Sequence, residues 1–379
     1  MSEPYVLFAE GRCEPDLLYA AGILLNEGVY LKFGDGDDVL AVPTMEVERA
    51  RTEGRAARVV DRIEAGWREQ PERVVAWAPA IASLARERGV ARLRAPARLP
   101  AALCDAVRAD GLEVEIDHEL LVAERRRKSK EEQSWIHAAQ RAAEAACLEV
   151  IRRLAAAEVR DDFLWEGGRP LTSEHLVAAA SATLEEVGYE STEMIVAGSP
   201  GCALPHYRGE GQLRAHQPVI IDIFPRGRHS GYHGDLTRTV IAGEVGDKWR
   251  RVNEAVLSAF DAGARELRAG ANGRTAHLAA CRALVEAGFG TSTPGFEGSA
   301  AAPHLTHSLG HGVGLAVHEP PFVRDLDYEL QAGDVHTVEP GLYEVGAGGI
   351  RWEDTGVVED GGFRNFSSLP KSLDPQAYL

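Results

Sequence analysis

Asp222 and Asp235 are the first of several acidic residues in the C-terminal half of the chain whose surroundings could support chemistry. Asp222 lies inside the apolar run 219–224, and Asp235 follows it by thirteen residues. A carboxylate in an apolar strand is costly unless it is paired, and a metal ion is one such partner. For this feature alone, a buried aspartate that accepts hydrogen bonds from a turn is the structural alternative.

A histidine-rich segment, residues 307–319, is the second feature. His311 and His318 are seven residues apart with an apolar stretch between them, which is unusual for a surface loop. Neutral imidazole can bind a metal or polarise a carbonyl group. The glycines on both sides of His311 are predicted to let the backbone approach a ligand closely. His304, which lies nearby, is interpreted as structural.

Two glutamates are the third feature. Glu339 closes a short β-like run in front of a Pro-Gly turn, and Glu353 follows fourteen residues later on the next strand-like run. Carboxylates on adjacent strands can face one cavity, although each glutamate alone is more often a salt-bridged structural residue.

Together, these four carboxylates and the imidazole of His311 can hold two divalent ions about 3.5–4 Å apart, with two carboxylates as bridges. Four negative charges in one cleft would repel each other strongly without such ions. A donor set made mostly of oxygen disfavours a thiolate-type zinc site. Manganese or cobalt is therefore the preferred assignment, with zinc or iron as alternatives.

The elements that must position these residues are read from apolar periodicity. Residues 1–124 carry no obvious chemistry, and we expect a small α/β domain there. Alternating residues predict a hairpin at 29–42 and a strand at 112–116, and helical patterns cover 45–53 and 80–88.

A second domain, residues 125–379, is expected to be α/β or α+β and to carry all five candidate ligands. Ser129 and Glu132 form a capping-box pattern in front of a long amphipathic helix. Further predicted elements are helices at 174–187, 247–267 and 275–287, a strand at 219–224 with a hairpin partner at 237–242, and β-like runs at 335–338 and 349–352.

The composition excludes some classes of partner. The 379 residues carry a formal net charge of −17, which on average repels nucleic acid and anionic membranes. The basic run 125–128 is interpreted as a solvated linker. Five scattered cysteines without a CxxC pair argue against a disulfide framework and fit a reducing cytoplasm. We see no signal peptide, and no apolar run reaches the roughly 18 residues of a membrane span.

With these motifs identified, the chain resembles the pita-bread metallopeptidases, the family of methionine aminopeptidase, prolidase and Xaa-Pro aminopeptidase. The resemblance covers residues 130–362. Residues 1–124 resemble, more weakly, the creatinase-type N-terminal domain of prolidases and Xaa-Pro aminopeptidases, on the segments 16–20 and 46–51. The expected fold is therefore a small α/β domain followed by a pita-bread catalytic domain.

The resemblance implies a role for each candidate ligand. Asp222 would be a terminal ligand of one ion, His311 and Glu339 would bind the other ion, and Asp235 and Glu353 would bridge the two. The ions would acidify a water and polarise the peptide carbonyl.

The resemblance also implies roles toward the substrate. Glu339 would carry a proton to the leaving amine, and His318 would touch the peptide or stabilise its tetrahedral oxyanion. His206 matches the substrate-side histidine of the family. Short peptides are the implied substrates, and a homodimer is the implied assembly.

The leading interpretation is a dinuclear metallo-exopeptidase that removes the N-terminal residue of peptides, as an Xaa-Pro aminopeptidase or dipeptidase. A broad-specificity aminopeptidase without a proline requirement is the first alternative. A lyase or other hydrolase on this fold, or a binding module, is the more distant one. Dipeptide specificity needs a basic group for the free carboxylate, and Arg324 and Arg351 are candidates.

Two departures from the family pattern bear on specificity. Asp222 and Asp235 lie farther apart in sequence than is usual in the family, which predicts a longer turn or bulge around residues 224–228, pointing near the cleft. The usual Gly-Asp before the first strand is replaced by His216 and Gln217, and His216 is interpreted as a surface loop residue.

Overall fold

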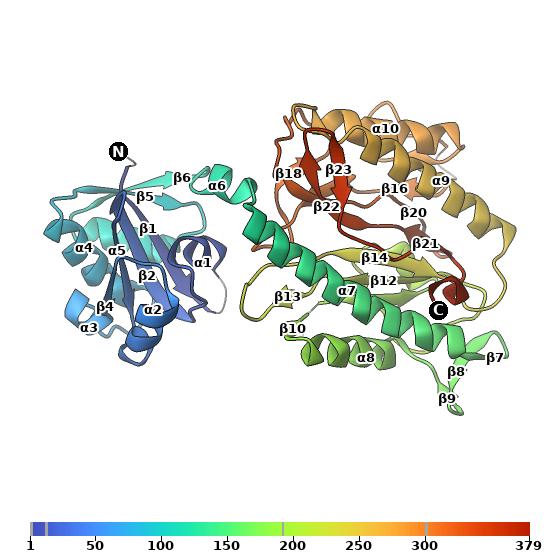
Figure 1. The fold of residues 1–379 in the computed structure, drawn as a ribbon, viewed down its shortest axis with the longest axis horizontal. Helices are drawn as coiled ribbons and strands as arrows, with labels where there is room; N and C mark the ends of the chain where they lie inside the picture. Colours follow the sequence, from blue (N-terminus) through green and yellow to red (C-terminus); the bar gives the residue numbers. More distant parts are fainter. Residues whose placement is uncertain (1–2, 12–13, 192, 300–301) are drawn as a thin grey trace. The chain divides into compact units, whose positions relative to one another are not determined.

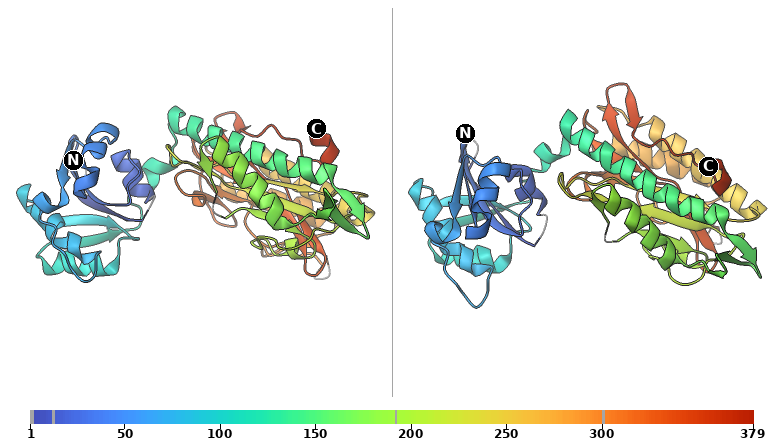
Figure 2. Two further views of the ribbon diagram at one scale, coloured as in Figure 1. Left: turned by 90° about the horizontal axis from the view of Figure 1, so that it is seen from below. Right: turned by 60° about the horizontal axis from the view of Figure 1, so that its bottom comes forward.

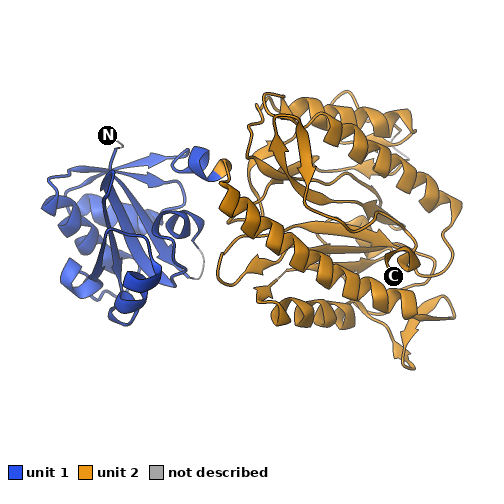
Figure 3. Cartoon of the chain, in the orientation of Figure 1, with its two compact units in different colours: residues 1–125 blue, residues 126–379 orange. Residues whose placement is uncertain are grey.

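The computed structural model describes residues 3–11, 14–191, 193–299 and 302–379 (Figure 1). They form two compact units that divide between Arg125 and Arg126 (Figure 3). Among the residues described, no helix combines the length and the apolar character needed to cross a membrane.

The first unit is a mixed sheet with helices on both faces. The strands run in the order β4-β3-β2-β1-β5-β6. Side chains alternate along β1, so that Val6 and Phe8 pack with α4 and α5 whereas Leu7 packs with α1 and α2. The strands are β1 Tyr5–Glu10, β2 Glu27–Gly34, β3 Asp37–Val42, β4 Arg58–Asp61, β5 Arg92–Pro96 and β6 Glu113–Asp117, and the helices are α1 Pro15–Ala21, α2 Val47–Glu53, α3 Arg62–Ala65, α4 Ala78–Glu87, α5 Ala101–Ala109 and α6 Val122–Arg126.

The second unit contains four long helices around several small sheets. The helices are α7 Lys130–Ala156, α8 Ser173–Glu186, α9 Asp247–Arg265 and α10 Gly273–Glu286. The strands are β7 Glu158–Arg160, β8 Phe163–Glu166, β9 Arg169–Pro170, β10 Tyr189–Glu190, β11 Ile195–Gly198, β12 Val219–Ile223, β13 Arg226–Gly227, β14 Leu236–Val240, β15 Gly290–Thr291, β16 His304–Leu305, β17 Gly310–Gly312, β18 Glu319–Val323, β19 Val335–Val338, β20 Gly341–Glu344, β21 Gly348–Arg351, β22 Asp354–Glu359 and β23 Gly362–Asn365.

Two helix pairs cover different sheets of this unit (Figure 2). Helices α7 and α8 pack on the sheet β11-β12-β14, whereas α9 and α10 pack on the strands of the sheets β18-β17-β19-β22-β23 and β15-β16-β20-β21. The predicted capping box is confirmed, because Ser129 accepts from the backbone N–H of Glu132 and the Glu132 carboxylate accepts from that of Ser129. The mixed α/β class expected from the sequence is confirmed.

Three residues of the basic run 125–128 differ from the solvated linker that we predicted, whereas Arg127 is exposed as expected. In the first unit, Arg125 donates to Asp16 over 2.7 Å. In the second unit, Arg126 pairs with Asp334 over 2.7 Å, and Lys128 is buried with its Nζ 2.7 Å from Glu319. These cations neutralise buried carboxylates, a requirement that the run of basic residues alone does not reveal.

Cys104, Cys147, Cys202 and Cys281 are free and buried. Cys13, the remaining cysteine of the predicted unpaired set, lies outside the described residues.

Candidate metal centre

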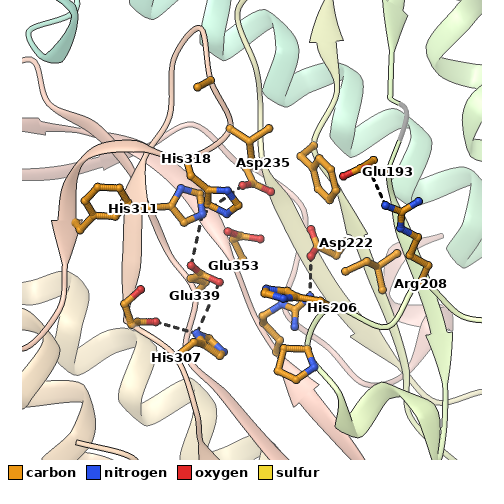
Figure 4. A pocket seen from close by; sticks show the side chains of 18 residues that line it. Glu193, His206, Arg208, Asp222, Asp235, His307, His311, His318, Glu339 and Glu353 are labelled. Atoms are coloured by element: carbon orange, nitrogen blue, oxygen red, sulfur yellow. Dashed lines mark hydrogen bonds and ion pairs between the residues drawn. The ribbon is translucent and has the colours of Figure 1, made fainter. Parts of the chain in front are cut away.

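One cavity of about 750 Å³ in the second unit is lined by all five candidate metal ligands and by His206 and His318. Its lining combines an acidic wall, formed by Asp222, Asp235, Glu339 and Glu353, with histidines that lie on more than one side of these carboxylates (Figure 4). The seven residues that the structure brings together there are His206, Asp222, Asp235, His311, His318, Glu339 and Glu353.

The hairpin formed by β12 and β14 positions the two aspartates. Asp222 lies opposite Thr237 in the antiparallel register. Because side chains alternate along a strand, Asp235, two residues before Thr237, faces the same side as Asp222. The backbone of Asp235 is held by α7, where the Gln140 side chain accepts from its N–H over 2.8 Å and donates to its carbonyl over 2.9 Å.

The longer connection between the aspartates is the extra strand β13, which pairs with β10. Only Phe224 of the predicted bulge lines the cavity. Arg226 and Arg228 instead form ion pairs with Glu190 and Glu185. The expectation that the extra residues point near the cleft therefore holds for Phe224 and is wrong for the two arginines.

Asp222 is held by an arginine from another sheet. Its Oδ2 accepts from Nη2 of Arg351 over 2.6 Å, whereas its Oδ1 is buried without a hydrogen-bond partner. A buried, unpartnered carboxylate oxygen costs free energy, and a cation would satisfy it. The two oxygens of Asp222 thus have separate surroundings.

His311 presents one ring nitrogen to the carboxylates. Its Nδ1 lies 3.1 Å from the carbonyl oxygen of Gly312, and its Nε2 lies 3.6 Å from Asp235 Oδ2 and 3.5 Å from Glu339 Oε1. If Nδ1 carries the proton, Nε2 is left with a lone pair that faces the acidic wall. Burial, with a contribution from His318, lowers the pKa of His311 to about 3, which keeps the ring neutral.

The glycines beside His311 let β17 pack closely against its two neighbouring strands. A Cβ on Gly310 would lie 2.1 Å from the carbonyl oxygen of Thr337 in β19, and one on Gly312 would lie 2.4 Å from that of Glu319 in β18. β17 can therefore pair closely with both neighbours only because these positions lack a side chain.

Glu339 follows β19 directly, and Glu353 lies between β21 and β22. Thr237 donates to Glu353 Oε2 over 2.7 Å. Burial raises the pKa of Glu339 to about 8, with Arg351 lowering it and Asp222 raising it. Burial and then the Glu339 carboxylate raise the pKa of Glu353 well above its usual range.

Asp235 is subject to the same repulsion between like charges. Burial, followed by the carboxylates of Glu353 and Asp222, raises its pKa well above its usual range. Four acidic groups cannot all be charged in one low-dielectric cavity without counter-charge. The arrangement therefore fits bound cations better than it fits four free carboxylates.

Ligand atoms of Asp235, His311 and Glu353 all lie within 4.8 Å of one another, so this buried group could hold a metal ion. Glu339 reaches the same group through its contact with His311. The unpartnered oxygen of Asp222 adds a further donor at the cavity wall. Oxygen donors with one imidazole nitrogen suit divalent metals.

The other two predicted histidines occupy different walls. His318 is exposed to the cavity and lies edge-on against His311, with ring centroids 4.2 Å apart. His206 follows the short helix Gly201–Ala203 and lines the cavity near Asp222 (Figure 4).

Sequence reasoning missed His307, although it lies in the histidine-rich segment. His307 Nε2 is 2.8 Å from the Tyr343 hydroxyl, and its Nδ1 is 3.9 Å from Glu339 Oε2. Its spacing of four residues from His311 was the available signal. Tyr343 carries no comparable signal, because it reaches the site through the pairing of β20 with β21.

The two arginines considered for substrate carboxylates have different positions. Arg351 lines the cavity but is buried and committed to Asp222, Thr237 and Tyr343. Arg324 is exposed, lies over the ring of Phe322 and is not part of the cavity lining.

Comparison with known proteins adds sequence relatives. The chain is 33% identical over 189 residues to the Xaa-Pro dipeptidase of Lactobacillus helveticus, covering 49% of this chain and 48% of that protein. It is 31% identical over 183 residues to the Xaa-Pro dipeptidase of Pyrococcus furiosus, covering 48% and 49%. These matches span about half of the length of each relative.

Solved structures cover nearly the whole chain. The prolidase from Pyrococcus horikoshii OT3 has a TM-score of 0.80 at 24% identity and covers 98% of this chain and 95% of that one. The Xaa-Pro dipeptidase from Bacillus anthracis has a TM-score of 0.81 at 24% identity, with coverages of 98% and 94%. At this identity the likeness concerns the fold, and it confirms the expected pita-bread architecture.

The family model for metallopeptidase family M24 matches residues 134–360, a span that contains all seven of the predicted site residues. Because this match covers more than half of the chain, the protein belongs to metallopeptidase family M24.

Proposed function

We propose that this chain is a dinuclear, metal-dependent exopeptidase that removes the N-terminal residue of short peptides, with preference for a residue that precedes proline. The observation that carries the proposal is the convergence of the four predicted carboxylates and the three predicted histidines on one cavity. A cavity of about 750 Å³ is within the range that accommodates small ligands. The curated relatives named Xaa-Pro dipeptidase support the choice of substrate class.

Five residues would hold the two ions in this proposal, namely Asp222, Asp235, His311, Glu339 and Glu353. Divalent ions bound there supply an activated water and polarise the scissile carbonyl. Thr237 and Arg351 hold Glu353 and Asp222 in position.

Hydrolysis breaks the peptide C–N bond, adds a hydroxyl to the carbonyl carbon and places a proton on the leaving nitrogen. Glu339 carries that proton in this proposal. His318, at the exposed wall, donates a hydrogen bond to the peptide or to the oxyanion that develops on its carbonyl. His206 contacts the substrate on the opposite wall.

The finer assignments stay predictions. By the resemblance described above, the proposal extends to four further properties. These are manganese or cobalt as the ion, a homodimeric assembly, a cytoplasmic location and a creatinase-type character of the first unit.

A cleavage assay tests the proposed function. The chelator-stripped protein, with manganese or cobalt restored, would be given an Xaa-Pro dipeptide, an Xaa-Pro tripeptide and a matched Xaa-Ala tripeptide. We expect metal-dependent release of the first residue only before proline. Glu339→Gln is expected to be inactive, and Glu359→Gln, which alters an exposed glutamate paired with Arg364, serves as its matched control.

Each other result selects a different function. Cleavage of the alanine peptide would indicate a broad aminopeptidase. Metal binding without cleavage of any peptide would favour a lyase, another hydrolase or a binding module on this fold.

A further inference from the structure

The cavity of the metal centre contains a second charged pair that the carboxylate cluster does not use. Arg208 Nη2 lies 2.7 Å from Glu193 Oε1, and both residues line the cavity (Figure 4). The two side chains are 61% and 59% exposed. Exposed pairs of this kind contribute little net free energy, so either partner can exchange for another ion at small cost.

Strand β11 places this pair beside Asp222. Ile195 of β11 lies opposite Asp222 of β12 in the antiparallel register. Glu193 precedes Ile195 by two residues, so its Cα is at most about 7 Å farther along the chain. The backbone N–H of Val196 donates to the carbonyl of Arg208 over 3.1 Å, which holds Arg208 against the same strand.

A dipeptide in an extended conformation spans about the same length. A substrate whose scissile bond lies at the carboxylate cluster can therefore present a charged group near Arg208. Ile195, Pro205 and Phe224 also line the cavity and supply apolar contact area.

Arg208 is the available cation of the lining. Among the described residues that line the cavity, the other arginine is Arg351, whose side chain is 4% exposed and already binds Asp222, Thr237 and Tyr343. Arg208, by contrast, has a solvated partner and unused donors on its guanidinium group. A guanidinium group can bind a carboxylate in a bidentate manner.

We propose that Arg208 binds a carboxylate of the substrate and that Glu193 occupies Arg208 until the substrate replaces it. The inference rests on the proposed peptidase function and names a specificity determinant of that site. The carboxylate belongs either to the C-terminus of a dipeptide or to an acidic side chain of the peptide. Either carboxylate would present two oxygens to the N–H donors of the Arg208 guanidinium group.

The test compares peptides that differ only in charge. Ala-Pro and its C-terminal amide isolate the terminal carboxylate, and the amides of Glu-Pro and Gln-Pro isolate the acidic side chain. KM and kcat are measured for the metal-loaded wild-type protein and for Arg208→Gln, Arg208→Lys and Glu193→Gln. Arg160→Gln is the matched control, because Arg160 forms an exposed pair with Glu158 in the β7–β8 hairpin and does not line the cavity.

In one of the two peptide pairs, we expect the KM of the wild-type protein to be lower for the peptide that carries the carboxylate than for its uncharged counterpart. Arg208→Gln should shrink that KM ratio about tenfold, because it removes a charge-assisted hydrogen bond, and Arg208→Lys should retain part of it. Glu193→Gln should lower the KM of the carboxylate peptide, because the competing carboxylate is gone. A purely structural pair would give no such gain, and Arg160→Gln should leave the ratio unchanged.

Which peptide pair shows the effect identifies the source of the carboxylate. A wild-type ratio near one in both pairs, or a ratio that survives Arg208→Gln, would overturn the proposal. If the wild-type protein cleaves none of the peptides, the proposed peptidase function fails on its own. The same four peptides titrated by calorimetry then give the Kd ratios that decide the role of Arg208.

Discussion

Arg351 and Asp222 form a buried hydrogen bond of 2.6 Å that joins two sheets of the catalytic unit. The guanidinium group is also held by the Tyr343 hydroxyl at 2.9 Å and by Thr237 Oγ1 at 3.2 Å. These contacts fix the orientation of the Asp222 carboxylate and leave its Oδ1 as the unpartnered oxygen. Arg351 is therefore a positioning residue for the proposed metal ligand.

Replacing Arg351 by Gln should lower kcat/KM about 10–100-fold, the usual cost of losing a group that orients a metal ligand. It should also destabilise the protein by about 3–5 kcal/mol, because Asp222 loses its buried partner. Peptide hydrolysis and urea unfolding measure the two effects. Arg324→Gln, at an exposed position outside the cavity, should change neither, and an active Arg351→Gln protein would refute the positioning role.

Thr237 separates positioning from simple packing. Its buried hydroxyl donates to Glu353 and accepts from Arg351, whereas the hydroxyl of Thr239, two residues along β14, donates to the backbone carbonyl of Arg351 over 2.8 Å. The variants Thr237→Val and Thr239→Val should each lose about 1–3 kcal/mol of stability, because each leaves a polar partner unsatisfied.

Only Thr237→Val is expected to weaken metal binding as well. Metal content after dialysis against a graded chelator series measures this difference. Equal metal loss in the two variants would mean that Thr237 acts through general stability and not through Glu353.

The sequence was informative where a local pattern carries the physical cause. Apolar periodicity and the Ser129 capping box predicted α7, and the apolar run around Asp222 predicted a strand with a hairpin partner, which is the pair β12–β14. Asp222 was visible as a candidate ligand because a carboxylate within an apolar strand differs from its neighbours, and the other candidates gained weight from their combination with it.

Contacts between distant segments were not visible in the same way. Arg351 and Asp222 are 129 residues apart in the chain, and no local pattern links them. Strand β13 was also not predicted. Its pairing with β10 depends on the fold, and its two residues form too short a run to predict a strand. Arg208 was overlooked because its neighbour in the cavity, Glu193, is identified only by the register of β11.

Removal of the metal ions should make stability depend on pH. The pKa of Glu339 is raised to about 8 in the folded chain, against an ordinary value of 4.5. Between these values the unfolded chain has released the proton that the folded chain keeps, so the free energy of unfolding falls as pH rises, by up to about 1.4 kcal/mol per pH unit for one such group.

Thermal unfolding of chelator-treated protein between pH 7 and pH 8 should therefore show a falling Tm. In this window the buried histidines His307 and His311, whose pKa is lowered to about 3, are neutral in the folded and in the unfolded chain and do not offset the decline. Restored manganese should raise Tm most at the upper end of this range, because bound cations favour the charged carboxylates. Glu339→Gln should flatten the decline of the metal-free protein. A Tm of the metal-free wild-type protein that rises steadily with pH would contradict the prediction.

The buried pair between Lys128 and Glu319 gives a test of the corrected view of the basic run. The two side chains are 1% and 7% exposed, and the second carboxylate oxygen of Glu319 accepts from the backbone N–H of Ala316 over 3.3 Å.

Lys128→Met should cost about 3–5 kcal/mol in urea unfolding, because it leaves a buried charge without its partner. In the double variant Lys128→Met/Glu319→Gln both charges are gone, so the loss should be smaller than the sum of the two single losses. Arg153→Met, which breaks the partly exposed pairs with Glu149 on α7 and with Glu166 on β8, should cost about 1 kcal/mol or less. If Lys128→Met costs no more than this control, or if the double variant is simply additive, the basic run is solvated after all.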